Sequence, residues 1–95
     1  MIDVNVRKDG ITVSGHAGYA EAGKDIVCAG VTALVQTLIG SIKGLTRDEI
    51  QYEISPGRAD IHYRDLSEEG KLLVDSFFIG ICRIADEFPD NVRIE

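Results

Sequence analysis

Short runs in which apolar and polar residues alternate constrain the fold of this chain more than any other feature of its sequence. The strands expected from this alternation cover residues 2–6, 11–13, 50–54, 59–63 and 92–94. Successive side chains of a strand point to opposite faces, so each run predicts a strand with one apolar and one polar face. Asp9-Gly10 joins the first two runs and Pro56-Gly57 the next two, and both pairs are typical of tight turns. The pattern therefore predicts five strands that include two hairpins.

Two longer stretches between these runs carry apolar residues at the spacing of an α-helix. The first stripe consists of Val27, Val31, Leu34, Val35, Leu38, Ile42 and Leu45, and the second of Leu73, Phe77, Ile81, Ile84 and Phe88. Asp25 and Ser67 precede the stripes and favour the N-cap position, while Gly44 and Pro89 act as stop signals. We expect one helix that follows Asp25 and ends near Gly44, and a second, the longest element, that follows Ser67 and stops at Pro89.

The faces of these elements indicate how they pack. Each predicted strand has one polar face and each helix one broad apolar face, so two helices on one side of the sheet bury the most apolar surface. We therefore predict a two-layer α+β fold, in which two helices pack on one face of a mostly antiparallel five-stranded sheet. The 95 residues suffice for one domain, spanning residues 1–95, with a core small enough that a partner subunit is compatible with it.

Charge and cysteine content limit the partners and the compartment. The formal net charge is −6, with acidic residues spread along the chain, which argues against a nucleic acid or an anionic membrane as the main partner. No apolar run approaches the roughly 20 residues that span a bilayer, and the N-terminal residues do not resemble a secretion signal. We expect a cytoplasmic protein whose two cysteines are free thiols.

A glycine-rich loop that leads into the first predicted helix carries a histidine and a cysteine suited to nucleophilic catalysis. His16 follows the second strand, and Cys28 is the third residue after the predicted N-cap, Asp25. A cysteine is a nucleophile only when deprotonated, and a neighbouring histidine or a helix N-terminus favours the thiolate. We expect His16 to act as general base and then general acid, and backbone N–H groups near Cys28 to bind an oxyanion.

The residues around this pair leave several roles open. Asp25 can cap the helix, orient His16 as the third member of a triad, or hold the loop through hydrogen bonds to its backbone. Of these roles we favour capping. The loop has three glycines and one large side chain, namely Gly15, Gly18, Gly23 and Tyr19. It is either a cover that closes over a bound peptide or a passive connector.

The same loop also resembles a phosphate-binding sequence. Residues 18–25 follow the pattern of glycine, four residues, glycine and lysine before a helix, except that Asp25 replaces the required serine or threonine. That hydroxyl binds the magnesium ion of a nucleotide, whereas a carboxylate there repels the phosphates. We therefore regard nucleotide binding as a weak alternative.

A metal site is a second weak alternative. The candidate zinc ligands are Cys28, Cys82, His16 and His62, but none of them show the close paired spacing of structural zinc sites. Cys82 lies in the apolar stripe of the second helix and is interpreted as a buried thiol, and His62 falls on the polar side of its strand. We predict no metal and no cofactor.

The run Gly15-His16-Ala17 followed by Asp25-Ile26-Val27-Cys28-Ala29 resembles the signature of the ribosomal-processing cysteine proteases, the Prp family. The resemblance extends over the whole chain. It implies a cytoplasmic, homodimeric peptidase that trims the N-terminal extension of a large-subunit ribosomal protein, the one numbered twenty-seven, and so supports ribosome assembly.

By this resemblance Cys28 is the nucleophile and His16 its base. Asp25 matches an acidic residue of the family, and Thr32 stands where serine is usual, so a hydroxyl is kept. Gly30 stands where alanine is commoner, and we interpret it as room for a substrate backbone. The alternative is a noncatalytic module that binds a ribosomal protein or dimerises, with a buried and inert Cys28.

Overall fold

The computed structural model describes all residues, 1–95, and contains the predicted elements in the predicted order. Their bounds are β1 (Ile2–Arg7), β2 (Gly10–Ser14), α1 (Ile26–Leu45), β3 (Ile50–Ser55), β4 (Arg58–Tyr63), α2 (Glu68–Glu87) and β5 (Val92–Ile94). Both helices contain 20 residues, so the expectation that the second is the longest element is wrong. Pro89 disfavours helical backbone at the residue before it, and Phe88 accordingly leaves the helix, with φ −128° and ψ 62°.

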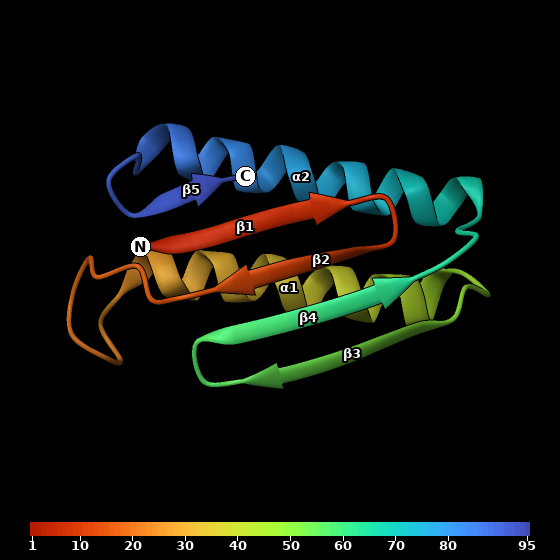
Figure 1. Cartoon of the computed structure of the whole chain (residues 1–95), viewed down its shortest axis with the longest axis horizontal. Helices are drawn as coiled ribbons and strands as arrows, with labels where there is room; N and C mark the ends of the chain where they lie inside the picture. The colour runs from red at the N-terminus through yellow and green to blue at the C-terminus, as the bar shows by residue number, and fades with distance from the viewer.

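The five strands form one sheet in the order β3-β4-β2-β1-β5 (Figure 1). The hairpins β1–β2 and β3–β4 are antiparallel, and β2 pairs antiparallel with β4, which joins two hairpins that lie far apart in the sequence. β5 lies parallel to β1, with Val92 opposite Ile2. The predicted mostly antiparallel sheet is confirmed, and its two free edges are β3 and β5.

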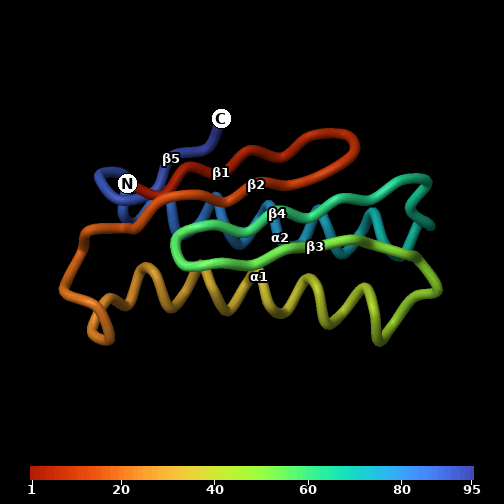
Figure 2. The backbone as a smooth tube through the Cα atoms, turned by 60° about the horizontal axis from the view of Figure 1, so that its bottom comes forward, coloured from red at the N-terminus to blue at the C-terminus, as the bar shows by residue number.

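Both helices cover the same face of the sheet (Figures 1 and 2). The core between the layers includes Val4, Ile11 and Ile61 from the strands and Val27, Ile42 and Ile81 from the helices, all nearly or fully buried. The opposite face of the sheet is polar and carries exposed ion pairs, such as Arg58–Asp60 and Arg93–Asp3. The predicted two-layer α+β fold is therefore confirmed.

α1 is more apolar than the sequence pattern led us to expect. By length and composition alone the helix could cross a membrane, which corrects the expectation that no run of the chain approaches that length. Buried helices of soluble proteins pass the same test, and the face of α1 that includes Val31, Val35 and Leu38 lies in the core. The high apolar content arises because the other face is made largely of small residues, including Ala29, Ala33 and Gly40.

Candidate active site

Asp25 caps α1 and also holds the loop that precedes it. Its Oδ1 accepts hydrogen bonds from the backbone N–H groups of Val27 and Cys28, both at 3.0 Å. Its Oδ2 accepts from the N–H groups of Tyr19 at 3.0 Å and Ala20 at 3.2 Å. The predicted capping role is confirmed, and loop holding accompanies it. The carboxylate makes no hydrogen bond to the loop histidine, so the triad arrangement is not present.

These hydrogen bonds predict how stability depends on pH. The N–H donors, with that of Cys28 foremost, hold the pKa of the Asp25 carboxyl below its ordinary value of 3.8. A lowered folded-state pKa means that the carboxylate stabilises the fold above the ordinary pKa and that this contribution is lost as the pH falls through the folded-state pKa. We expect the melting temperature of Asp25→Asn to fall less steeply than that of the native protein as the pH drops from about 4 to about 2.

The control for this measurement is Asp86→Asn, which removes an exposed carboxyl of α2 that forms no hydrogen bond. Asparagine can still cap through its oxygen, but its amide nitrogen cannot accept the hydrogen bonds that Tyr19 and Ala20 donate. We therefore also expect a lower melting temperature for Asp25→Asn than for the native protein at pH 7. The prediction is contradicted if the melting temperatures of the native protein and both variants fall in parallel between about pH 4 and about pH 2.

His16 lies just after β2, and two distant parts of the chain hold its backbone. The N–H of Gly15 donates to the carbonyl of Gly57 in the β3–β4 turn at 2.8 Å. The amino group of Met1 donates to the carbonyl of His16 at 2.5 Å. The imidazole packs directly on Gly57, because a Cβ added there would lie 2.8 Å from Nε2 of His16. The β3–β4 turn therefore forms a wall against which the histidine ring is placed.

The backbone of Ala17 links the histidine loop to the cysteine. Its N–H donates to Sγ of Cys28 at 3.3 Å, and its carbonyl accepts from Nδ2 of Asn91 at 2.9 Å. Ala17 is only 2% exposed, and both contacts are partly buried. A donor at this place stabilises negative charge on the sulfur. Sequence reasoning missed Ala17 as a donor and Asn91 as its partner, because a backbone N–H carries no residue-type signal and 74 positions separate the two residues.

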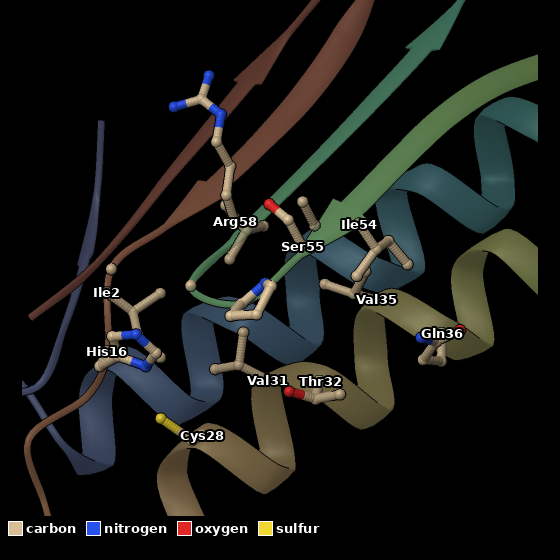
Figure 3. Close-up of a pocket in the computed structure, with 15 residues that line it drawn as sticks. Ile2, His16, Cys28, Val31, Thr32, Val35, Gln36, Ile54, Ser55 and Arg58 are labelled. Carbon is tan, nitrogen blue, oxygen red and sulfur yellow. The ribbon is translucent and has the colours of Figure 1, made fainter.

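His16 and Cys28 line one cavity of about 450 Å³ between α1 and the β3–β4 hairpin (Figure 3). The other walls are largely apolar or small and include Ile2, Val13, Val31, Val35, Ile54, Pro56, Gly57 and Ala59. The imidazole and the thiol make no hydrogen bond with each other, as is common for a catalytic pair without substrate. His16 is exposed and Cys28 half-buried, so both can meet a peptide bond in this space.

Two further residues of α1 are placed differently with respect to the cavity. Thr32, one turn after Cys28, borders this cavity and also a second hollow on the loop side of the helix. Gly30 faces the other helix instead, because an added Cβ would lie 3.4 Å from Cδ1 of Ile84 in α2. The expectation that Gly30 makes room for a substrate is wrong, since Gly30 faces α2 and lines neither the cavity nor the second hollow.

The N–H groups of the first turn of α1 are engaged, contrary to the expectation that they bind an oxyanion. Those of Val27 and Cys28 donate to the Asp25 carboxylate, and that of Ala29 donates to the Asp25 carbonyl at 3.1 Å. A good N-cap residue satisfies the donors that an anion would otherwise use. The same contacts argue against phosphate binding in the loop, because a carboxylate already occupies the anion position.

The loop before α1 makes contacts with the rest of the protein in its first part and few in its second part. Tyr19 packs edge-to-face on Phe88, with ring centroids 5.4 Å apart. Gly15, Gly18 and Gly23 all have positive φ. Residues 21–24 are fully on the surface, and the exposed ion pair Lys24–Glu21 at 3.0 Å adds little to their stability. A cover that opens would therefore have to move residues 21–24, whereas Tyr19 and Ala20 before them are held by Asp25 and Phe88.

The residues considered for zinc do not come together. His62 is exposed on β4 beside Asp65 at a separate hollow, and Cys82 lies half-buried in α2. No three histidine, cysteine, aspartate or glutamate side chains form a cluster able to hold a metal ion. The polar placement of His62 is confirmed, and the expectation of a buried Cys82 is corrected. The reason is that Cys82 lies at the border of the apolar stripe, next to the fully buried Ile81.

Comparison with known proteins connects this site to a family. The model of the family described as "Cysteine protease Prp" matches residues 1–93 of the chain. The chain belongs to the Prp family of cysteine proteases. The resemblance found in the sequence is thereby confirmed, and the alternative of a noncatalytic module is set aside.

Several Prp proteins are similar to the chain over its whole length. The "Ribosomal processing cysteine protease Prp" of Staphylococcus aureus is 31% identical over 100 residues, which cover 98% of this chain and 94% of that protein. The protein of the same name from Mycoplasma genitalium is 35% identical over 97 residues, covering 99% and 94%. A crystal structure of S. aureus Prp with a covalently linked product peptide has a TM-score of 0.90 and 27% identity, covering 99% of this chain and 95% of that one. A second S. aureus structure, with a substrate peptide, has a TM-score of 0.83.

Proposed function

We propose that this Prp protease removes the N-terminal extension of a large-subunit ribosomal protein, the one numbered twenty-seven, and so supports ribosome assembly. The observation that carries the proposal is the shared cavity of Cys28 and His16 in a chain of the Prp family. The names of the S. aureus and M. genitalium relatives describe ribosomal processing, and one S. aureus structure holds a substrate peptide. The largely apolar walls of the cavity suit an apolar side chain beside the bond that is cut.

In the proposed reaction His16 accepts the proton of the Cys28 thiol, and the thiolate attacks the carbonyl carbon of the peptide bond. The tetrahedral intermediate collapses as the C–N bond breaks, and the imidazolium gives its proton to the leaving amine. Water then attacks the thioester, with His16 accepting its proton, and releases the carboxylate of the extension while the thiol is restored. Each step needs only these two side chains and one water molecule.

Neighbouring groups support this dyad in the proposed reaction. The N–H of Ala17 donates to Sγ of Cys28 and would stabilise the thiolate before attack. Thr32 contributes a hydroxyl to the cavity wall one turn away, and this hydroxyl forms no hydrogen bond within the protein, so it is available to a substrate oxygen. Asp25 has a positioning role, because it fixes the first turn that carries the nucleophile.

We further propose that the enzyme acts as a homodimer in the cytoplasm. The core of a 95-residue chain is small, and α2 leaves Leu72 and Ile79 exposed by 69% and 61%, which a second copy would cover. Both cysteines are free, as the sequence predicted. Free thiols are usual in a reducing compartment such as the cytoplasm, and this supports the proposed location.

The experiment that tests this function is cleavage of a peptide that spans the N-terminal extension of the host's own ribosomal protein, followed by mass spectrometry. We expect one cut, at the end of the extension, by the reduced native protein. The control peptide has the same composition with the extension residues in scrambled order. Survival of the native-order peptide, and then of the full-length ribosomal protein, at enzyme concentrations equal to substrate would rule out this substrate.

A further inference from the structure

We infer that the substrate peptide binds as an additional strand on the free edge of β3, and that the groove between this edge and α1 leads the peptide to Cys28. The inference rests on the proposed peptidase function and adds to it the backbone surface that recognises the substrate. Four observations carry it: the orientation of the unpaired backbone groups, the apolar side chains beside them, the continuity with the catalytic cavity and the contrast with the other edge.

β3 presents backbone groups that no other strand uses. Ser55 and Arg58 flank the two-residue turn of the β3–β4 hairpin and therefore form a hydrogen-bonded pair. Bonded and non-bonded pairs alternate along an antiparallel ladder, so Tyr52 and Ile54 direct their N–H and C=O groups away from β4. Since β3 is the end strand of the sheet, these groups are free to pair with an extended peptide.

The side chains at this edge are apolar and uncovered. Tyr52 is 43% and Ile54 45% exposed, although both project on the same side of the sheet as the core residue Ile61 opposite Tyr52. Free edges in natural sheets are usually short or guarded by charged side chains, but β3 is six residues long and has Glu53 as its only charge. A strand added at β3 would cover the exposed side chains of Tyr52 and Ile54.

The edge and the active site form one continuous surface. Ile54, Ser55 and Pro56, at the end of β3, are also walls of the cavity that holds His16 and Cys28 (Figure 3). Farther along this edge Tyr52 approaches Lys43 of α1, with 3.2 Å between Oη and Nζ. The helix rise over residues 28–43 is about 22 Å, which an extended peptide spans with about six or seven residues. A peptide of this length paired with β3 would therefore reach from Tyr52 to Cys28 with the residues on one side of its scissile bond.

The other free edge lacks these properties. β5 has three residues, packs beside α2, and contributes no residue to the catalytic cavity. A second copy of the chain on β3 would lie across the mouth of the groove that leads to Cys28. The position of the nucleophile thus favours an extended substrate peptide as the occupant of β3.

Backbone N-methylation of the substrate peptide tests this inference with a control built into the peptide. In a paired strand the N–H groups point alternately toward and away from β3. We expect N-methyl groups at every second residue on the β3-bound side to lower kcat/KM by about tenfold or more, because each removes a hydrogen bond and adds a clash. N-methyl groups at the residues between them should have little effect. The scissile amide is left unmodified.

A pair of protein variants gives a second readout. Tyr52→Pro removes an N–H that makes no ladder bond, and proline is tolerated at such edge positions, so the fold should persist. Tyr52→Ala removes the side chain but keeps the N–H. We expect a larger increase in KM for Tyr52→Pro than for Tyr52→Ala, with kcat retained in both, and circular dichroism shows whether both remain folded.

The outcomes distinguish a failure of binding on β3 from a failure of the proposed peptidase function. Equal effects of N-methylation at neighbouring positions overturn binding on β3, even when the unmodified peptide is cut as proposed. Conversion of a dimer into a monomer by Tyr52→Pro, with KM unchanged, overturns it in favour of a second copy on this edge. Failure to cut the unmodified peptide contradicts the proposed function itself, and the inference fails with it.

Discussion

Replacing Cys28 by alanine is expected to abolish peptide cleavage, with a loss of about 10⁴-fold or more in kcat. The sulfur is half-buried at the start of α1 and receives the N–H of Ala17, and it lies in the same cavity as His16. Alanine removes only the sulfur atom and leaves the Asp25 cap of α1 unchanged, so the fold should persist. The measurement is cleavage of the ribosomal extension peptide by the native and variant proteins at equal concentration, with the product quantified by mass spectrometry.

The matched control is Cys82→Ala, which removes the other free cysteine, away from the cavity. We expect native-like cleavage in this variant. His16→Ala should lose activity to a similar degree, and the double variant Cys28→Ala with His16→Ala should be no worse than either single one, because groups that act as a unit are not additive. Residual activity of Cys28→Ala within tenfold of the native rate, a limit of about 1.4 kcal/mol in barrier height, would assign the chemistry to another residue.

Replacing Gly57 by alanine is expected to lower kcat/KM by about 100-fold through displacement of the histidine. A Cβ at this position would lie 2.8 Å from Nε2 and 3.3 Å from Cε1 of His16, so the ring must move. Gly57 also has a φ of +74°, where an alanine costs about 1–2 kcal/mol of stability. Steady-state kinetics and thermal unfolding of the same variant measure both effects.

A second substitution separates the displaced ring from backbone strain. Asparagine adopts positive φ more readily than alanine but carries the same Cβ. Gly57→Asn should therefore be more stable than Gly57→Ala while it loses as much activity. If activity follows the melting temperature across the two variants instead, backbone strain is the cause and Gly57 does not position the histidine.

The sequence predicted the elements well because their signals are local. Asp25 and Ser67 mark the helix starts through their own capping bonds, and Pro56-Gly57 is the turn between β3 and β4 as predicted. The first turn lies one residue earlier than predicted, at Lys8-Asp9, because Gly10 pairs with Arg7 as the first residue of β2. The errors have local causes as well. Pro89 shortened α2 through its effect on Phe88, and the small residues of α1 made a core helix apolar enough to pass for a membrane span.

For the site, the sequence by itself proposed Cys28 and His16 as the side chains that do the chemistry, and the structure places both at one cavity. Only the tertiary structure decided what surrounds them. The pairing of β2 with β4 brings Gly57 against His16, the α2–β5 connection brings Asn91 to Ala17, and the strand order leaves β3 open. Such contacts depend on strand order and on backbone groups that every residue type shares. They therefore cannot be predicted from the residue types at single positions.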